Sequence, residues 1–143
     1  MDVLEFRGPF RFLSNFWFTP VTLDGETYPT VEHAYQAAKT LSIVRRRAIQ
    51  EAPQPGDAKR QGRTVPLRPG WDAMRLDVMC DLLEQKFARE PLRSLLLATG
   101  EVLLIEGNHW GDTFWGVCRG MGENHLGRLL MAAREEIRAR DVM

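Results

Sequence analysis

The chain has 143 residues, of which 44% are hydrophobic and 27% charged, and this length suits a single domain over residues 1–143. Its 19 basic and 19 acidic side chains cancel, which excludes a global field that would attract nucleic acid or an anionic membrane. The 2 cysteines do not make a disulfide scaffold. With no apolar run of about 18 residues and no signal-peptide pattern at the N-terminus, we expect a cytoplasmic protein without a membrane partner.

The first elements are a hairpin and a helix. VTL and ETY flank an Asp-Gly turn signal at residues 24–25, which predicts a β-hairpin. The Pro-Thr pair after it starts a helix that we expect to end near Leu41, with Thr30 as its N-cap. Before the hairpin, most of the aromatic rings in residues 10–18 are expected to pack in the core.

Helices dominate the rest of the chain. Apolar spacing and breaker residues predict helices at 42–51, at 57–62 with Asp57 as cap, at 71–89, at 92–98 and at 126–138. The apolar face of the first of these would hold Ile43, Val44, Ala48 and Ile49. We therefore predict an α+β fold that is predominantly helical, with a few short strands.

Two neighbouring segments differ from this helical pattern. EVLLIE at 101–106 is the best predicted strand, and the glycine-rich stretch 107–127 is predicted to be a loop. This loop holds six glycines, two tryptophans and four groups able to carry protons, namely His109, Asp112, Glu123 and His125. Glycine lets backbone approach a ligand, and tryptophan offers a face for stacking. A tight cluster of turns that caps the core is an equally good interpretation.

The helix in TYPTVEHAYQAAK carries several reactive groups on one face. Glu32 and Lys39 are two turns apart, and Tyr35 and Gln36 lie on the face of Glu32. A carboxylate can stabilise the positive charge that develops on a sugar ring when a glycosidic bond breaks. From these residues alone, an ordinary exposed helix with polar residues is the better interpretation.

Other chemistries find little support. The 3 histidines and 2 cysteines form no pair at metal-ligand spacing, so we expect no metal site. The sequence also lacks a P-loop, a G-x-S-x-G elbow and a dinucleotide-binding fingerprint inside a βαβ unit.

A family resemblance changes this balance. FLSNFWFTPVTLDGETYPTVEHAYQAAK resembles the opening block of the NADAR, or YbiA-like, family. Further matching pieces follow in order over nearly the whole chain: AKxxGR at 58–63, PLRxxWD at 66–72, VMxxxLxxKF at 78–87, LLxTG at 96–100, DxxWG at 112–116 and GxNxLGxLLM at 122–131.

The resemblance implies a small, mainly helical α+β protein that hydrolyses N-glycosidic bonds without a metal or redox cofactor. Two substrate classes are associated with such proteins: phosphoribosylaminopyrimidine intermediates of riboflavin synthesis, and ADP-ribose attached to guanine. A partner would thus be a small nucleotide-like molecule or ADP-ribosylated nucleic acid. The oligomeric state is left open.

Site residues follow from the same resemblance. It implies catalytic roles for Glu32, Asp112 and Lys39, with Glu32 as the catalytic carboxylate and Asp112 at the sugar. The remaining pocket residues would be Asn15, Phe16, Arg63, Trp71, Lys86, Trp115 and Asn124. Lys39, Arg63 and Lys86 would hold phosphate.

Departures and alternatives accompany these expectations. Trp17-Phe18 departs from the family pattern at the edge of the pocket. The stretch GNHWG, with His109 and Trp110, has no counterpart in that pattern, so substrate choice is a candidate role for it. Glu32 would activate water or stabilise the sugar cation, and a Schiff base on Lys39 ranks below direct hydrolysis. The main alternative is a non-catalytic module that binds ADP-ribose or a nucleotide. An aromatic interaction surface is a weaker one.

Overall fold

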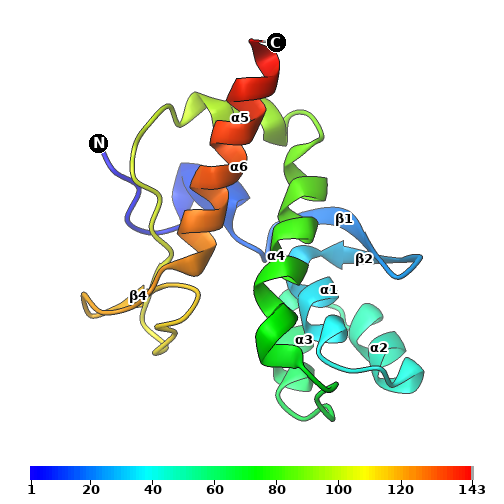
Figure 1. The fold of residues 1–143 in the computed structure, drawn as a ribbon. Helices are drawn as coiled ribbons and strands as arrows, with labels where there is room; N and C mark the ends of the chain where they lie inside the picture. The colour runs from blue at the N-terminus through cyan, green and yellow to red at the C-terminus, as the bar shows by residue number, and fades with distance from the viewer. Residues whose placement is uncertain (143) are drawn as a thin grey trace. The chain divides into compact units, whose positions relative to one another are not determined.

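The computed structural model describes residues 1–142 and separates into two compact units (Figure 1). The central unit is Asn15–Lys86, and the terminal unit combines Met1–Ser14 with Phe87–Met143. Helices predominate over short strands in both units, which confirms the predicted α+β, mainly helical fold. The organisation as one domain over residues 1–143 stays a prediction.

The central unit begins with the predicted hairpin. Strand β1 (Phe18–Leu23) pairs with β2 (Glu26–Thr30) in antiparallel register, with Val21 opposite Tyr28 and Leu23 opposite Glu26. Both turn residues have positive φ, 49° at Asp24 and 82° at Gly25, as a two-residue hairpin turn requires. The Asp-Gly signal therefore set the turn and the register correctly.

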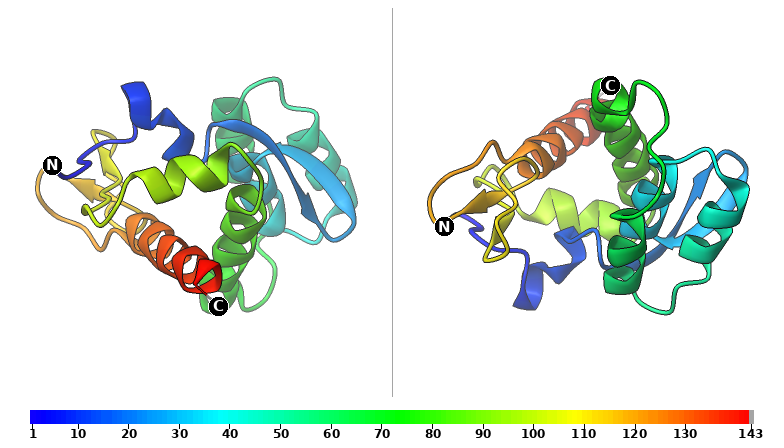
Figure 2. Two further views of the ribbon diagram at one scale, coloured as in Figure 1. Left: turned by 90° about the horizontal axis from the view of Figure 1, so that it is seen from above. Right: turned by 90° about the horizontal axis from the view of Figure 1, so that it is seen from below.

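Helix α1 (Val31–Ala38) packs against both strands and against helices α2 (Ile43–Gln50) and α3 (Pro55–Gly62) (Figures 1 and 2). All eight residues of α1 are buried, which excludes the ordinary exposed helix that the residues alone favoured. The helix ends three residues before the expected Leu41. Beyond it, the backbone N–H of Arg68 donates to the carbonyl of Lys39 over 2.7 Å.

Helices α2 and α3 correct two predictions. In α2 the residue Ile49 is buried, but Ile43 and Val44 are 75% and 79% exposed, so the predicted apolar face is wrong. Helix α3 starts at Pro55, two residues before the predicted start, and its capping box pairs Gln54 with Asp57. Asp57 therefore lies inside the first turn of α3 and is not the N-cap.

Helix α4 (Trp71–Phe87) follows the loop after α3 and matches its predicted start. The aromatic stretch before the hairpin differs from expectation. Phe12 is buried, but Phe16, Trp17 and Phe18 are all exposed, so the prediction that most of these rings pack in the core is wrong.

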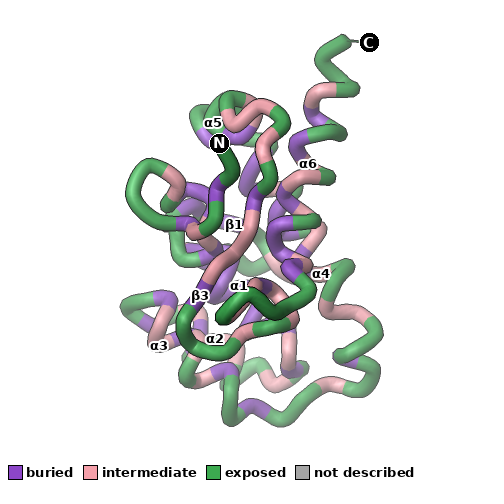
Figure 3. The backbone as a smooth tube through the Cα atoms, turned by 90° about the vertical axis from the view of Figure 1, so that its left-hand side faces the viewer, coloured by how far each residue is buried: buried purple, intermediate pink, exposed green. Residues whose placement is uncertain are grey.

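The terminal unit contains the 3₁₀ helix η1 (Gly8–Leu13), helices α5 (Leu92–Ala98) and α6 (His125–Asp141), and the short strands β3 (Gly107–Asn108) and β4 (Val117–Cys118). The strands pair in parallel, so the stretch predicted as a loop contains regular pairing. Buried and exposed residues alternate along α6 (Figure 3). Its buried positions include Leu126, Leu130, Arg134 and Ile137, the spacing of one helix face.

The EVLLIE segment forms a single bridge instead of the predicted strand. Leu104 pairs in parallel with Val3, and two backbone hydrogen bonds flank this bridge, from Val3 to Leu103 and from Ile105 to Val3. None of the helices in residues 1–142 has the length and apolar character needed to cross a bilayer.

Candidate active site

The start of α1 is fixed by a reciprocal pair of contacts between Thr30 and His33. The Thr30 hydroxyl oxygen accepts from the backbone N–H of His33 at 3.0 Å and lies 2.7 Å from its Nδ1. His33 Nε2 is 3.0 Å from the carbonyl of Ala52. Since a carbonyl can only accept, Nε2 carries the proton, and the hydroxyl of Thr30 donates to Nδ1. Burial lowers the pKa of His33, so this histidine is a neutral structural residue.

Glu32 follows the N-cap of α1 and is 8% exposed. Its Oε2 accepts a hydrogen bond of 2.6 Å from Nε2 of Gln36, one turn later. Its backbone N–H donates to the carbonyl of Asn15 over 3.1 Å, which ties the residue before the hairpin to the start of α1. The first turn of a helix also favours a negative charge. The local fold thus holds a buried carboxylate in one orientation.

Lys39 caps the C-terminal end of α1, and its ammonium lies 5.6 Å from the centroid of the Tyr35 ring. Burial is the main cause that lowers the pKa of Lys39, and the charges of Arg63, Lys59 and Arg75 lower it further. The charge of Glu32 acts in the opposite direction and raises this pKa. The central unit therefore gathers three basic side chains around a half-buried lysine, an arrangement suited to an anionic ligand.

Two aromatic residues named from sequence have different surroundings. Trp71 is buried at the start of α4, and its ring packs on Tyr35 with 5.4 Å between centroids. Phe16 is 40% exposed. Trp71 therefore packs against α1, while Phe16 is partly exposed to solvent, and the substrate contacts of both residues stay predictions.

Asn15 and Lys86 are both buried polar residues of the central unit. Asn15 Nδ2 lies 3.6 Å from the sulfur of Met79, and its Oδ1 has no hydrogen-bond partner within residues 1–142. Lys86 is 0% exposed, and burial lowers its pKa to about 7. The phosphate-binding role predicted for Lys86 stays a prediction, as does the ligand contact of Asn15.

Four residues of this region were absent from the sequence-based site: Gln36, Lys59, Gly62 and Arg75. The i, i+4 spacing of Gln36 from Glu32 was a usable signal, because an amide one turn from a carboxylate on the same face can donate to it. Gly62 stands in the AKxxGR piece, next to the predicted Arg63. Lys59 and Arg75 had no local signal, since their proximity to Lys39 depends on how the helices pack.

Three predicted site residues belong to the terminal unit, and Asp112 organises a turn there. Its Oδ1 accepts from the backbone N–H groups of Phe114 at 3.1 Å and Trp115 at 2.9 Å. Its own N–H donates to Asn108 Oδ1, and Asn108 Nδ2 donates back to the Asp112 carbonyl. These bonds give Asp112 a structural role in the loop, and its catalytic role stays a prediction.

Asn124 and Trp115 are also engaged within the terminal unit. Asn124 Nδ2 donates to the carbonyl of Leu104, and its Oδ1 accepts from the backbone N–H of Glu106, both at 3.0 Å. Trp115 meets Phe114 edge to face, with 4.8 Å between ring centroids. The amide of Asn124 therefore joins the start of α6 to the segment before β3. The substrate contacts of both residues stay predictions.

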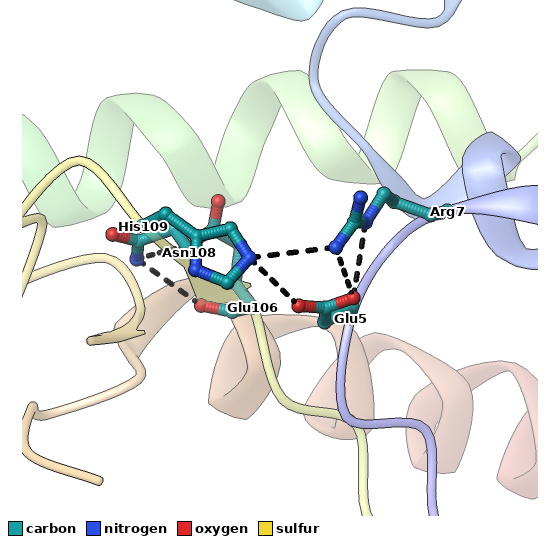
Figure 4. A network of polar contacts seen from close by, with 5 residues as sticks. All are labelled: Glu5, Arg7, Glu106, Asn108 and His109. Carbon is teal, nitrogen blue, oxygen red and sulfur yellow. Dashed lines mark hydrogen bonds and ion pairs between the residues drawn. The ribbon is translucent and has the colours of Figure 1, made fainter. Parts of the chain in front are cut away.

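The GNHWG stretch is linked to the N-terminal segment of the same unit (Figure 4). His109 Nε2 lies 3.4 Å from both Glu5 Oε1 and Arg7 Nη2, and Arg7 pairs with Glu5 at 2.7 Å. Trp110, the next residue, is 60% exposed. The possible role of this stretch in substrate choice stays a prediction.

Across residues 1–142, no group of three or more His, Cys, Asp or Glu side chains is placed to hold a metal ion. The features of the central unit are thus a buried, oriented carboxylate on α1 and a group of basic side chains near the end of the same helix. A group of basic side chains of this kind is suited to an anionic ligand.

Comparison with known proteins identifies the family. The family model of the NADAR domain matches residues 5–138. "N-glycosidase YbiA" of Escherichia coli is 41% identical over 128 residues, covering 87% of this chain and 79% of that protein. The NMR structure of E. coli YbiA superposes with a TM-score of 0.86 at 36% identity, covering 99% of this chain and 88% of that one. The chain belongs to the NADAR family.

A longer relative carries a different name. "Riboflavin biosynthesis protein VVA0006" of Vibrio vulnificus is 38% identical over 130 residues, which are 88% of this chain. The matched part is 35% of that protein, so the chain spans about a third of its length.

Proposed function

We propose that this protein hydrolyses the N-glycosidic bond of a phosphoribosylaminopyrimidine intermediate of riboflavin synthesis. The general part of this statement, a hydrolase acting on N-glycosyl bonds, follows from membership of the NADAR family and from the similarity to an N-glycosidase. The choice of substrate is supported by the name of the Vibrio relative.

The observation that carries the proposal is the environment of Glu32. A carboxylate that is 8% exposed, at the start of a helix and bonded to Gln36, has a fixed direction and is largely removed from water. Breaking an N-glycosidic bond gives an oxocarbenium-like sugar, and a fixed carboxylate beside the anomeric carbon stabilises it. An ordinary helix surface would offer no such preorganised charge.

Hydrolysis moves the following atoms. The bond between the anomeric carbon and nitrogen breaks, and its electron pair stays on nitrogen. A water oxygen forms the new bond to carbon, and one of its protons ends on the leaving nitrogen. Glu32 takes that proton or stabilises the sugar cation directly.

The basic residues would bind the phosphate of such a substrate. The charges of Arg63, Lys59 and Arg75 lower the pKa of Lys39, so these cations lie in the same region, and we assign phosphate binding to this group. We assign the contact with a sugar or base edge to Asn15, whose buried Oδ1 accepts from N–H or O–H groups.

The lowered pKa of Lys39 also supports the second chemical route. Burial and neighbouring cations lower the pKa of Lys39, which increases the fraction of the nucleophilic amine form. On an opened ribose this amine would form an imine at the former anomeric carbon as the base leaves, and water would then hydrolyse the imine. We still rank this route below direct hydrolysis.

Side-by-side incubation with the phosphoribosylaminouracil intermediate and with ADP-ribosylated guanine DNA tests the proposal, with released base measured by chromatography. We expect release from the first substrate and its loss in Glu32→Gln. Release of base from the DNA alone would show that ADP-ribosylated guanine, and not the riboflavin intermediate, is the substrate. Binding of ADP-ribose without release from either substrate would favour the non-catalytic module.

A further inference from the structure

We propose that Gln36 is a positioning residue for Glu32, and that Gly62 is required because its missing side chain leaves room for the amide of Gln36. This inference rests on the proposed function, in which Glu32 is the catalytic carboxylate. It concerns two residues that neither the sequence pattern nor the family resemblance placed in the site.

The orientation of the Gln36 amide follows from its neighbour. Nε2 of Gln36 lies 2.6 Å from Glu32 Oε2, and an ionised carboxylate can only accept hydrogen bonds. The NH₂ group must therefore face Glu32, and the amide oxygen must face away from it. The side chain is 4% exposed, so water does not compete for either end.

The amide oxygen has an unfavourable position. Oε1 of Gln36 is buried and, in the part of the chain that the structure describes, has no hydrogen-bond partner. Such an oxygen is destabilising relative to a hydrated one. A glutamine kept only for stability would be expected to satisfy both ends of its amide. The oxygen of Gln36 is left unpaired because its NH₂ group donates to Glu32, and a hydrogen bond to a charged group is stronger than one between neutral groups.

Gly62 explains how the oxygen fits. A Cβ at this position would overlap Oε1 of Gln36 and would lie 2.6 Å from its Cδ. The three atoms nearest to such a Cβ all belong to Gln36. Helix α3 therefore approaches α1 at a glycine whose bare Cα sits against the amide. Any larger residue would rotate or displace the group that holds Glu32.

The first test replaces Gln36 by Met, which keeps the length of the side chain and removes both the donor and the buried oxygen. We expect kcat to fall by about 10- to 100-fold, the range for losing a hydrogen bond to a charged group, while KM stays within about 2-fold. The melting temperature should stay equal or rise. A structural role predicts the reverse: a lower melting temperature with kcat unchanged in the folded protein.

The control variant is Gln50→Met in α2. Gln50 Nε2 donates to the carbonyl of Thr27 over 2.8 Å, so this substitution also removes a glutamine hydrogen bond, but one to the backbone. We expect its kcat to match that of the unmodified protein. An equal loss in both variants would overturn the assignment.

The second test is a double-mutant cycle between Gly62 and Gln36. Gly62→Ala should reduce kcat, and its further effect should largely vanish in a Gln36→Ala background, where the overlapping Oε1 and Cδ are gone. Gly56→Ala in the same helix is the matched control, since its Cβ would meet Arg60 at an ordinary 3.9 Å. Independent effects of Gly62→Ala and Gln36→Ala would contradict the inference.

A third measurement needs no substrate and so separates this inference from the proposed function. In NMR spectra, the side-chain NH₂ signals of Gln36 should be shifted from those of exposed glutamines and should move in Glu32→Gln. If the protein released no base from either substrate, the proposed function would fail while these signals would still report the contact. Signals like those of a free amide would overturn the positioning role.

Discussion

Helix α1 and the loop 107–127 both carry predicted site residues, yet they satisfy their polar groups in different ways. In the loop, Asp112 and Asn124 direct their side chains to backbone partners nearby. Around α1, buried oxygens of Gln36 and Asn15 have no partner among residues 1–142, and Glu32 is bonded to another side chain. Side chains that bond to nearby backbone groups stabilise the fold. The unpaired Oδ1 of Asn15 is available to a ligand, whereas the unpaired Oε1 of Gln36 results from the donation of its NH₂ group to Glu32.

Among the tests of this contrast, Glu32→Gln is expected to have the largest effect. We expect turnover to fall by about 1,000-fold or more with the fold intact, because the charge that supports the sugar cation is lost. Base release gives the rate, and circular dichroism checks the fold. Glu51→Gln, an exposed residue at the end of α2, serves as the control. Full activity of Glu32→Gln would show that the carboxylate on α1 takes no part in the reaction.

Lys39→Arg is the next test, because it keeps a positive charge and removes a titratable amine. If the amine reacts, activity should fall by about 100-fold, similar to the loss of a positioned proton-transfer group. In the unmodified protein, activity should rise with pH through the lowered pKa of Lys39, since the amine form increases there. Retention of most activity in Lys39→Arg would leave the residue as a simple cation.

Lys86 provides a test that concerns stability. Its pKa of about 7 in the folded state lies below the usual lysine value, so the unfolded state binds more protons between these two pH values. Stability should therefore rise from pH 7 toward pH 10, by at most about 1.4 kcal/mol per pH unit, and should be lost again as the pH falls to 7. Denaturant unfolding at several pH values measures this.

In Lys86→Met that rise should disappear, and the variant should be at least as stable at neutral pH. An unchanged slope would show that Lys86 is not the group that titrates. It would also keep open the predicted contact of Lys86 with phosphate.

The smallest effect is expected in the loop. Asp112→Ala removes the acceptor for two backbone N–H groups and should cost about 1 kcal/mol of stability, as the loss of a helix cap does. Asp112→Asn keeps Oδ1 and should cost less. Its activity should stay far above that of Glu32→Gln. If Asp112→Asn lost as much turnover as Glu32→Gln, the contrast between the loop and α1 would be wrong, and the catalytic role that the resemblance implied for Asp112 would be supported.

Local signals predicted the elements whose geometry depends on near neighbours. The Asp-Gly turn determined the hairpin, and the hydroxyl of Thr30 marked the start of α1, since both act within a few residues. The strand predicted at 101–106 was wrong because pairing there depends on a segment far away in the sequence, around Val3. The apolar face predicted for Ile43 and Val44 was wrong because periodicity does not show whether another element covers that face of the helix.

The residues of the candidate site also differ in whether neighbours close in sequence revealed them. Glu32 and Lys39 were found because one helix places them on one face, and the resemblance gave them roles. Gln36 had a local signal that was left out of the site. Gly62 and Arg75 act through packing between helices, which a single sequence does not encode locally.

The terminal unit is built from two separate pieces of chain, Met1–Ser14 and Phe87–Met143, with the whole central unit between them. During synthesis, all of Asn15–Lys86 leaves the ribosome before α6 exists. The bridge from Val3 to Leu104 must likewise wait for its second half. The central unit, with Glu32, Gln36 and Gly62, thus has its full sequence while the N-terminal segment has no partner, so translation itself imposes an order in which these parts acquire their contacts.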